Sequence, residues 1–491
     1  MPLRRLLQRA EKAFVAGNHL DAERLFIEVL KNHPNNAMAL QRRARLSYLM
    51  GHHGAAAEFL RRSLASAPQQ PEAWVSVAEL YRALGRADLA REAYNNLTAL
   101  FPDIALGHTQ TGIQDIFDGD SDKGLAGLRK GLELDPESGL AMLALARVGG
   151  LAEDDPAVGL MEALFDKPTV PLQSRLEAGF ARAEVALSSA NKAGYWDWLV
   201  KVNALQRAAV KGGIVEVAAL FDDIRRSLDS RFLDHARAPA LQAPFTPIFI
   251  VGAPRSGAWL LEDHLARHPQ ITAGGSPFFL EQRIVVAAAS VTRTLYPGAA
   301  RALTAERRTH LAKEYYRLML DQQLGGRFII DSNADNIRHI GLIKLLFPEA
   351  RVIHISRDPM AAGFSAFRHF LRGNQAFECS LEDFANYHRL VGELMDHWRT
   401  VCPGFVTDIS YEDLVADPRG ALSPVFDRLG LTAGAECHRP GPALRGRRAE
   451  NLFQSREAAA GEATVDWHDF EEGLAPLSAA LSAKKPGFLI G

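Results

Sequence analysis

Residues 245–270 read FTPIFIVGAPRSGAWLLEDHLARHPQ, and this order predicts a strand, a glycine-rich turn and a helix. The apolar run Ile248–Val251 is short and β-branched, as a buried strand is, and the turn spans Gly252–Gly257. Residues at helical spacing follow the turn: Leu260, Leu261, Leu265 and His268. A helix N-terminus offers unpaired N–H groups and a positive dipole end, and Arg255 adds a planar cation. The stretch therefore predicts an anion site.

The turn matches only the first half of a nucleotide-binding P-loop. Gly252-x4-Gly257 is present, but Ala258 and Trp259 stand where a Lys and a Ser or Thr should follow. A P-loop kinase, which would bind ATP with magnesium, is therefore disfavoured. The stretch instead resembles the 5′-phosphosulfate loop of sulfotransferases, roughly G-x-P-R-S-G-T-T-L followed by an H-P-Q-V-like end, here His268-Pro269-Gln270-Ile271. A tight strand–helix turn without a ligand is the alternative.

Length and composition indicate a multidomain globular protein. The chain has 491 residues, 47% of them hydrophobic and 23% charged, which predicts about two to four domains. A net charge of −2 gives no basic field for nucleic acid. Three scattered cysteines suggest neither a disulfide framework nor a zinc site. No apolar run is long enough for a membrane span, and the N-terminus lacks a secretory pattern, so a cytoplasmic location is expected.

Four markers recur every 34 residues in the first part of the chain. They are glycines at 17, 51, 85 and 119, prolines at 34, 68, 102 and 136, small residues at 22, 56, 90 and 124, and larger residues at 26, 60, 94 and 128. Thirty-four residues is the tetratricopeptide period. The glycine suits the turn or close approach of two helices, the small residue their crossing, and the proline the start of the next unit. We predict a tetratricopeptide α-solenoid over residues 3–137, with a coincidental helical bundle as the alternative.

Such an array presents a concave face, because each repeat buries its apolar side only against its neighbours. This face could bind a protein or peptide, or the array could be a spacer or dimerisation arm, and the repeat pattern does not decide between them. Residues 138–240 are predicted as a helical extension with a degenerate repeat, including helices at Arg175–Leu187 and Tyr195–Val210, without a clean 34-residue register. A linker rich in proline follows at Ala238–Pro247.

Strands and helices alternate in the remainder, which predicts a P-loop-like α/β domain at 245–485. Strands are expected at 327–331, 351–356 and 405–409, and helices at 337–347, 360–371 and 381–401 and around Leu414 and Leu422. This alternation implies a parallel sheet with helices on both faces. Ligands of such sheets gather at the carboxyl ends of the strands, where the turns at Gly252 and Arg357 both fall.

A second anion-binding pattern lies at Arg357 and Ser365, where a guanidinium and a hydroxyl converge on a helix start. Taken alone, Arg357 could equally belong to a surface turn. The pair resembles the sulfotransferase site for the 3′-phosphate of 3′-phosphoadenosine 5′-phosphosulfate (PAPS). Tyr411-Glu412-Asp413-Leu414 resembles a segment that closes over the nucleotide, and Arg448–Arg456 with Trp467–Leu477 resembles the C-terminal region of that pocket.

With the repeats in front, nearly the whole chain resembles the tetratricopeptide-repeat sulfotransferases, relatives of tyrosylprotein sulfotransferases. The resemblance implies PAPS as co-substrate, a hydroxyl-bearing acceptor and no metal. It also implies which residues bind the nucleotide: Arg255, Ser256, Gly257, Ala258 and Trp259 at the 5′-phosphosulfate, Arg357 and Ser365 at the 3′-phosphate, and Tyr411 near the base.

Several positions depart from the family's pattern. The family's Thr-Thr is Ala258-Trp259, its presumed general base Glu is Ser276, and the Lys that steadies the leaving oxygen is Ser332. Near the C-terminus, Asp466 replaces a basic residue and Asn451 replaces a Ser. A general base is worth ~10²–10⁴ in rate and one electrostatic donor ~10²–10³. The catalytic residues are therefore unassigned, and the possible stand-ins, each with a surface or packing role as the alternative, are Glu262, Glu281, His264 and His354.

Two functional hypotheses follow from these patterns. The first is PAPS-dependent transfer of a sulfuryl group to a hydroxyl of a protein or glycan, with the repeats binding the acceptor or a partner. The second is a catalytically impaired sulfotransferase fold that serves as an interaction scaffold or nucleotide-binding pseudoenzyme. The retained anchors favour nucleotide binding in both cases. Because several catalytic positions are replaced, the two hypotheses differ in whether sulfuryl transfer occurs.

Overall fold

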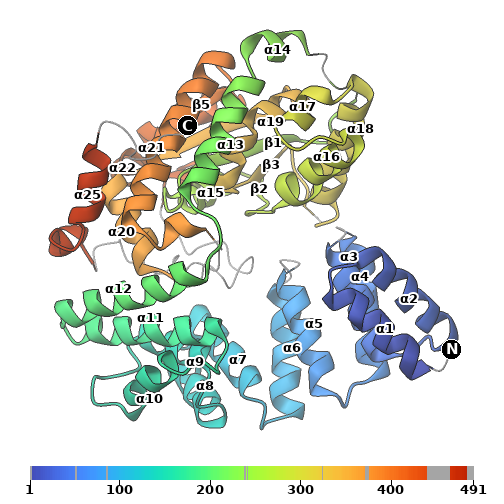
Figure 1. Cartoon of the computed structure of the whole chain (residues 1–491), viewed down its shortest axis with the longest axis vertical. Helices are drawn as coiled ribbons and strands as arrows, with labels where there is room; N and C mark the ends of the chain where they lie inside the picture. Colours follow the sequence, from blue (N-terminus) through green and yellow to red (C-terminus); the bar gives the residue numbers. More distant parts are fainter. Residues whose placement is uncertain are drawn as a thin grey trace. The chain divides into compact units, whose positions relative to one another are not determined.

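The computed structural model describes residues 3–49, 52–83, 87–236, 239, 241–322, 324–370, 375–439 and 465–483. Within these residues the chain divides into two compact units, one up to Tyr195 and one from Trp196 onward (Figure 1). This division lies earlier than the predicted domain limit near residue 240. Helices between the two positions belong to the core of the second unit, as described below.

The first unit is built from helices alone in the residues described. They are α1 (Leu3–Val15), α2 (His19–Asn32), α3 (Ala37–Leu49), α4 (His53–Ser66), α5 (Pro71–Ala83), α6 (Ala87–Leu100), α7 (Ala105–Asp118), α8 (Ser121–Leu134), α9 (Gly139–Arg147), α10 (Pro156–Phe165) and α11 (Leu172–Ser188). The first helix of each pair begins at residue 3, 37, 71 or 105, and the second at 19, 53, 87 or 121. The 34-residue period predicted from the sequence is therefore the period of the helical hairpins.

The sequence markers occupy the places that the repeat demands. Ala22 and Ala56 are fully buried where the two helices of a hairpin cross. Gly124 takes this place in the fourth hairpin, where an added Cβ would lie 2.3 Å from Cγ1 of Ile116. Gly119 adopts a φ of +96° in the turn between α7 and α8, as Gly17 does earlier at +73°. Their counterparts at positions 51 and 85 lie outside the described residues.

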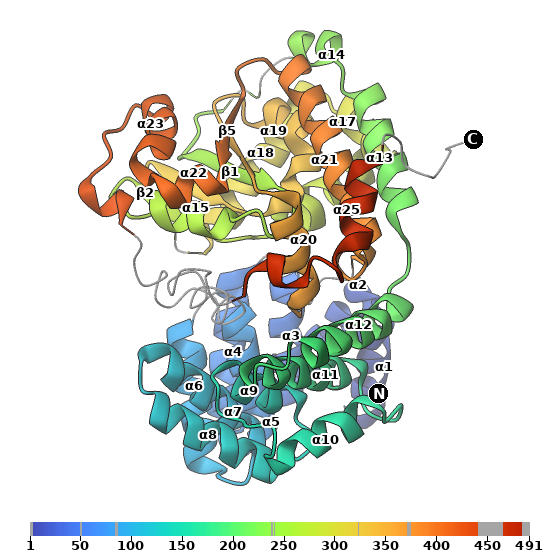
Figure 2. The same ribbon diagram turned by 90° about the vertical axis from the view of Figure 1, so that its left-hand side faces the viewer.

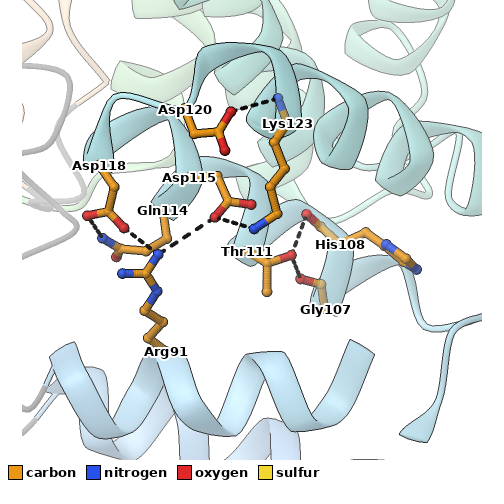
Figure 3. A network of polar contacts seen from close by, with 9 residues as sticks. All are labelled: Arg91, Gly107, His108, Thr111, Gln114, Asp115, Asp118, Asp120 and Lys123. Carbon is orange, nitrogen blue, oxygen red and sulfur yellow. Dashed lines mark hydrogen bonds and ion pairs between the residues drawn. The ribbon is translucent and has the colours of Figure 1, made fainter. Parts of the chain in front are cut away.

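A charged network joins the third hairpin to the fourth (Figure 3). The guanidinium of Arg91 on α6 pairs with Asp118 on α7 and lies 3.6 Å from Asp115 on the same helix. Lys123 on α8 donates to Asp115 at 3.0 Å. The network thus crosses from one repeat to the next, which is where a solenoid derives its cooperativity.

The fifth hairpin keeps the 34-residue register, but its first helix pairs with α11 instead of with the next helix in the chain. Helix α9 begins at Gly139, 34 residues after α7, although no clean register was expected beyond residue 138. It packs on α11, and a Cβ on Gly139 would lie 2.4 Å from the carbonyl oxygen of Ser174. Helix α10 is therefore an insertion between the two helices that pair.

The second unit contains a sheet and its covering helices. Its helices are α12 (Lys192–Ala209, which begins in the first unit), α13 (Ile214–Ser227), α14 (Ser230–His235), α15 (Ala258–Leu265), α16 (Val286–Thr292), α17 (Gly298–Ala302), α18 (Ala305–Leu320), α19 (Ile340–Leu346), α20 (Pro359–Arg368), α21 (Leu381–Val401), α22 (Tyr411–Ala416), α23 (Pro418–Leu429) and α25 (Ala475–Ser482). Its strands are β1 (Thr246–Gly252), β2 (Ile271–Ala273), β3 (Phe328–Asp331), β4 (Arg351–Ser356) and β5 (Val406–Ser410). Short helical segments are the π-helix η1 (Leu280–Val285) and the 3₁₀ segments η2 (Ala334–His339), η3 (Ala376–Glu378), η4 (Ala435–His438) and η6 (Trp467–Phe470).

The five strands form a parallel sheet in the order β2-β3-β1-β4-β5. Successive residues of β1 point to opposite faces, because side chains alternate along a strand. Phe249 and Val251 join a core with helices including α13, α18, α19 and α21, whereas Ile248 and Ile250 join a core with α15, α22 and α23. Figure 2 shows the sheet between these two groups of helices. Helices on both faces of a parallel sheet are thus confirmed.

Residues 214–233 explain why the second unit begins so early. Phe221, Ile224 and Leu228 are buried in the same core as the sheet residues Phe249 and Ile329. Trp196 stacks on Phe470 with ring centroids 5.9 Å apart, so its indole ring packs inside this unit. Among the described residues no helix combines the length and the hydropathy that a membrane crossing requires.

Some local structure differs from the expectation. The segment expected as one helix at 337–347 begins as the 3₁₀ segment η2, whose start is capped by the Asn333 side chain, and continues as α19. The short strand β2 and the helices from η1 to α18 were not predicted. Strand β2 has only three residues, too few to show a period of two.

Candidate functional site

The glycine-rich turn after β1 is held in a conformation that few residues adopt. Arg255 has a φ of +64° and Gly257 a φ of +97°, so the chain curls back before α15 begins. The N–H groups of Leu260 and Leu261 donate to the Gly257 carbonyl, which starts the helix. Ser256 is 2% exposed, and its Oγ has no hydrogen-bond partner among the described residues. A buried hydroxyl without a partner beside a helix N-terminus is a place for an anion's oxygen.

The second predicted corner follows β4. Asp358 caps α20 by accepting from the N–H of Ala361 at 2.8 Å, and its own N–H donates to Glu412 at 2.8 Å. This pins the turn so that Arg357, directly before it, extends from the carboxyl end of the strand. Ser365 lies almost two turns into α20 and is 7% exposed.

The two corners meet. The Nε–H of Arg255 donates to Ser365 Oγ at 2.9 Å, and Nη1 of Arg357 donates to the carbonyl oxygen of Arg255 at 3.2 Å. Strands β1 and β4 are neighbours in the sheet, so their carboxyl ends bring residues more than 100 positions apart into contact. The two arginines therefore lie together at the carboxyl ends of neighbouring strands.

Tyr411 completes this arrangement from the third strand end. It begins α22 directly after β5, and the guanidinium of Arg357 stacks over its ring at 4.2 Å from the centroid. The ring also packs under the turn, because a Cβ on Gly257 would lie only 2.3 Å from Tyr411 Cδ2. Ala258 and Trp259 begin α15 next to it and are partly exposed.

A carboxylate ties together the two loops on the other side of β1. Glu262 on α15 accepts from the N–H of Gly275 and from Ser332 Oγ, both at 2.7 Å. Ser332 follows β3, and its N–H donates to the Gly275 carbonyl. Ser276, where the resemblance leads us to expect the general base, is partly exposed in the loop after β2. The replaced positions Ser276 and Ser332 thus lie in loops that Glu262 joins.

Comparison with known proteins agrees with both halves of this architecture. The profile of the sulfotransferase family matches residues 247–434, from β1 to just beyond α23, and that of the tetratricopeptide repeat matches residues 71–104, the hairpin of α5 and α6. The chain joins tetratricopeptide repeats to a sulfotransferase-family domain. All the predicted anchors, from Arg255 to Tyr411, lie within the matched part of that domain.

Individual relatives are more distant. An uncharacterized protein of Aquifex aeolicus (strain VF5) is 23% identical over 334 residues, which cover 66% of this chain and 43% of that protein. The match thus spans less than half the length of that relative. Among solved structures, a thermophilic TPR protein of Thermus thermophilus is 22% identical with a TM-score of 0.30, covering 36% of this chain and 98% of its own. PilW, a type IV pilus biogenesis factor, is 19% identical with a TM-score of 0.34, covering 41% of this chain and 92% of its own.

Three of the four possible stand-ins have partners elsewhere in the sulfotransferase-family domain. His264 Nδ1 bonds to the Cys437 carbonyl, and burial lowers the pKa of this imidazole. His354 bonds to Asp408 across β4 and β5 and, with Arg399, holds the pKa of that carboxyl well below its usual range. Glu281 bonds to the buried His339, which lowers the pKa of the Glu281 carboxyl. Only Glu262 touches one of the replaced positions.

Asp331, the residue before Ser332, is fully buried at the end of β3. It accepts from the Tyr315 hydroxyl at 2.9 Å and from the Asn336 amide at 2.9 Å. Burial raises the pKa of Asp331 to about 7, with the nearby Glu262 adding to the effect and the hydrogen bonds opposing it. The carboxyl end of β3 therefore carries a buried carboxyl group that titrates near neutral pH.

The C-terminal positions are only partly described. Asp466 caps η6 by accepting from the N–H of His468 and is exposed, and Trp467 stacks on the His468 ring at 3.8 Å. Asn451 and the segment Arg448–Arg456 lie outside the described residues.

One charged residue near the anchors was missed by the sequence reasoning. Glu378, in η3 between α20 and α21, interacts electrostatically with Arg255 and Asp335, and burial raises the pKa of its carboxyl group to about 8. No motif marks this residue, because its burial depends on how distant parts of the chain pack around it. Its raised pKa and its electrostatic interaction with Arg255 single it out.

Proposed function

We propose that the sulfotransferase-family domain binds PAPS and transfers its sulfuryl group to a hydroxyl of an acceptor. The observation that carries this proposal is the convergence of Arg255, Arg357 and Ser365 at neighbouring strand ends. PAPS is an anion at both ends, and two guanidinium groups together with a hydroxyl are the chemistry that such a ligand requires.

The position of each residue indicates which part of the nucleotide it would bind. The amides at the start of α15, the buried hydroxyl of Ser256 and Arg255 face the end that carries the 5′-phosphosulfate. Arg357 and Ser365 take the 3′-phosphate, and Tyr411 lies where the base would pack. Preorganised donors of this kind stabilise charge that develops on the leaving phosphate oxygens.

Hydrogen-bond donors near the start of α15 would suit the nucleotide. Ser256 Oγ lacks a partner among the described residues, and the helix start supplies N–H groups that no intrahelical carbonyl can accept. Arg255 bonds to the very hydroxyl, Ser365, that would share the ligand with it. A bound phosphate would replace this contact between the two residues.

The second candidate function is nucleotide binding without transfer. It is favoured by the replacements at Ala258, Trp259, Ser276 and Ser332, which remove hydroxyls, a carboxylate and a cation from the pattern of the family. Losing a general base alone costs ~10²–10⁴ in rate. In both candidates the repeats serve as the scaffold that holds an acceptor protein or another partner.

Calorimetry with adenosine 3′,5′-bisphosphate, followed by transfer of labelled sulfate from PAPS to a panel of hydroxyl compounds and peptides, tests the proposal. Binding with transfer supports the first candidate, and binding without transfer supports the second. The absence of binding contradicts both. Magnesium-dependent binding of ATP in the same calorimeter would instead favour a P-loop kinase.

A further inference from the structure

A cavity that opens to solvent lies between α14 and α18 in the second unit. It has a volume of about 250 Å³ and is lined by Phe232, His235 and Ala236 on one side and by Ala305 and Arg308 on the other. This volume is below the ~300–1,000 Å³ of sites for drug-sized ligands and equals the share of about eight liquid waters at ~30 Å³ each. The cavity therefore suits a small molecule. None of its lining residues belongs to the two arginine-bearing corners at the strand ends.

Phe232 provides the main apolar surface of this cavity. Its backbone is fixed at the start of α14, where Asp229 caps the helix by accepting from the Phe232 N–H at 2.8 Å. The guanidinium of Arg301 lies over the ring at 4.8 Å from the centroid. Arg301 is itself anchored, because it donates to the Ser227 carbonyl at 2.6 Å and lies 3.6 Å from the Asp229 carboxylate. The ring thus has a defined position against which a ligand can pack.

The cavity also carries a buried cation. Arg308 is 6% exposed, and its guanidinium lies 5.7 Å from the centroid of the Phe232 ring, so Arg301 and Arg308 share this ring. Burial lowers the pKa of Arg308, because it removes water that would solvate the charge. An anion would compensate for this lost solvation. The planar guanidinium fits a carboxylate or phosphate group through two parallel hydrogen bonds.

Two further groups on the cavity wall suit an anion. Nδ1 of His235 lies 2.7 Å from the Arg231 carbonyl oxygen, so Nε2 is the ring nitrogen that remains for a ligand, and it donates when the ring is protonated. Ala305 is the first residue of the 16-residue helix α18. The N–H groups of a first turn have no intrahelical acceptor, so they add to the positive potential around Arg308.

We propose that this cavity binds a small organic anion, whose carboxylate or phosphate group bonds to Arg308 and whose short apolar part packs on Phe232. The two parts of the ligand correspond to the two kinds of wall. Arg308 and His235 supply the charge, and Phe232, Ala236 and Ala305 supply the apolar surface. The site is separate from the proposed nucleotide site, and it does not depend on sulfuryl transfer.

Ligand-observed NMR with benzoate as the probe, in the presence of adenosine 3′,5′-bisphosphate, tests the site. Benzoate should bind the wild type with a Kd of ~1 mM or below. Benzamide has nearly the same shape without the charge and should bind about 10- to 100-fold more weakly, the scale of a hydrogen bond to a charged group. Phenyl phosphate is measured in the same way, and binding of either anion supports the site. Inorganic phosphate lacks the apolar part and should bind more weakly than phenyl phosphate.

Ala305→Glu tests whether the anion lies in this cavity, because it adds a carboxylate to the wall. An acidic residue in the first turn of a helix is favourable, so the variant should fold as the wild type does. It should weaken benzoate binding at least tenfold. Ala475→Glu, the same change at the exposed first residue of α25, is the matched control and should bind benzoate as the wild type does. Arg308→Gln should also lose binding, and Ala305→Glu keeps the test decisive if Arg308→Gln does not fold.

The outcomes separate this inference from the proposed function. Benzoate binding that is unchanged in Ala305→Glu, benzamide that binds as tightly as benzoate, or no binding of either anion overturns the site. Equal binding of inorganic phosphate and phenyl phosphate overturns the role of Phe232. The affinity of Ala305→Glu for the bisphosphate should equal that of the wild type in calorimetry. A protein that does not bind the bisphosphate removes the nucleotide site only, because Ala305→Glu still locates the benzoate.

Discussion

Gly257→Ala should destabilise the second unit by about 2–5 kcal/mol. Gly257 has a φ of +97°, a conformation that costs a residue with a Cβ about 1–2 kcal/mol. The new methyl carbon would also lie 2.3 Å from Tyr411 Cδ2, well inside van der Waals contact. Tyr411 is 8% exposed and stacked under Arg357, so its ring has little room to move. Overpacking of this kind adds about 1–3 kcal/mol.

Urea unfolding followed by tryptophan fluorescence measures this cost, because five of the six tryptophans lie in the second unit. Gly404→Ala is the matched control: Gly404 has a φ of +70°, but a Cβ there would meet nothing within 4 Å. It should cost only the backbone strain, about 1–2 kcal/mol. In a Tyr411→Ala background, Gly257→Ala should fall to the cost of the control, because the clash is gone. Equal costs for Gly257→Ala and Gly404→Ala in the wild-type background would refute the packing of Tyr411 under the turn.

Three further predictions concern the same strand ends. Arg357→Ala should weaken bisphosphate binding by about 1.5–3 kcal/mol in calorimetry, the scale of a hydrogen bond to a charged group. Arg351→Ala, at the opposite end of β4, is the control and should leave bisphosphate binding unchanged. Equal effects of the two substitutions would mean that Arg357 holds no phosphate. Ala258→Thr should tighten bisphosphate binding if the loop has only lost a hydroxyl, and a flat or weaker affinity would mean that Trp259 has remodelled the pocket. Asp331 is protonated in the folded state up to pH about 7 but ionises near pH 4 when unfolded. The stability of the wild type relative to Asp331→Asn should therefore fall by ~1–3 kcal/mol between pH 5 and 8. A difference in urea unfolding that stays constant with pH would contradict the raised pKa.

The repeats and the strand–turn–helix core could be predicted from the sequence because their signals are local. A repeat that must stack on its own copies keeps glycine, proline and small residues at one spacing, and the hairpins begin at that spacing in the structure. The helix at Leu381–Val401 was predicted at its observed bounds, because its apolar residues keep one helical period over 21 positions. Short elements such as β2 carry too few residues for a period to emerge.

What the sequence alone determined, then, is the order of the elements, the 34-residue period and the identity of the arginine-bearing turns. The tertiary structure decided which of these residues meet. Arg255 reaches Ser365 across 110 positions, and Glu262 reaches Ser332 across 70, only because β1 lies between β3 and β4 in the sheet. The same holds for the raised pKa of Glu378, since desolvation is a property of the atoms packed around a group and not of its neighbours in the chain.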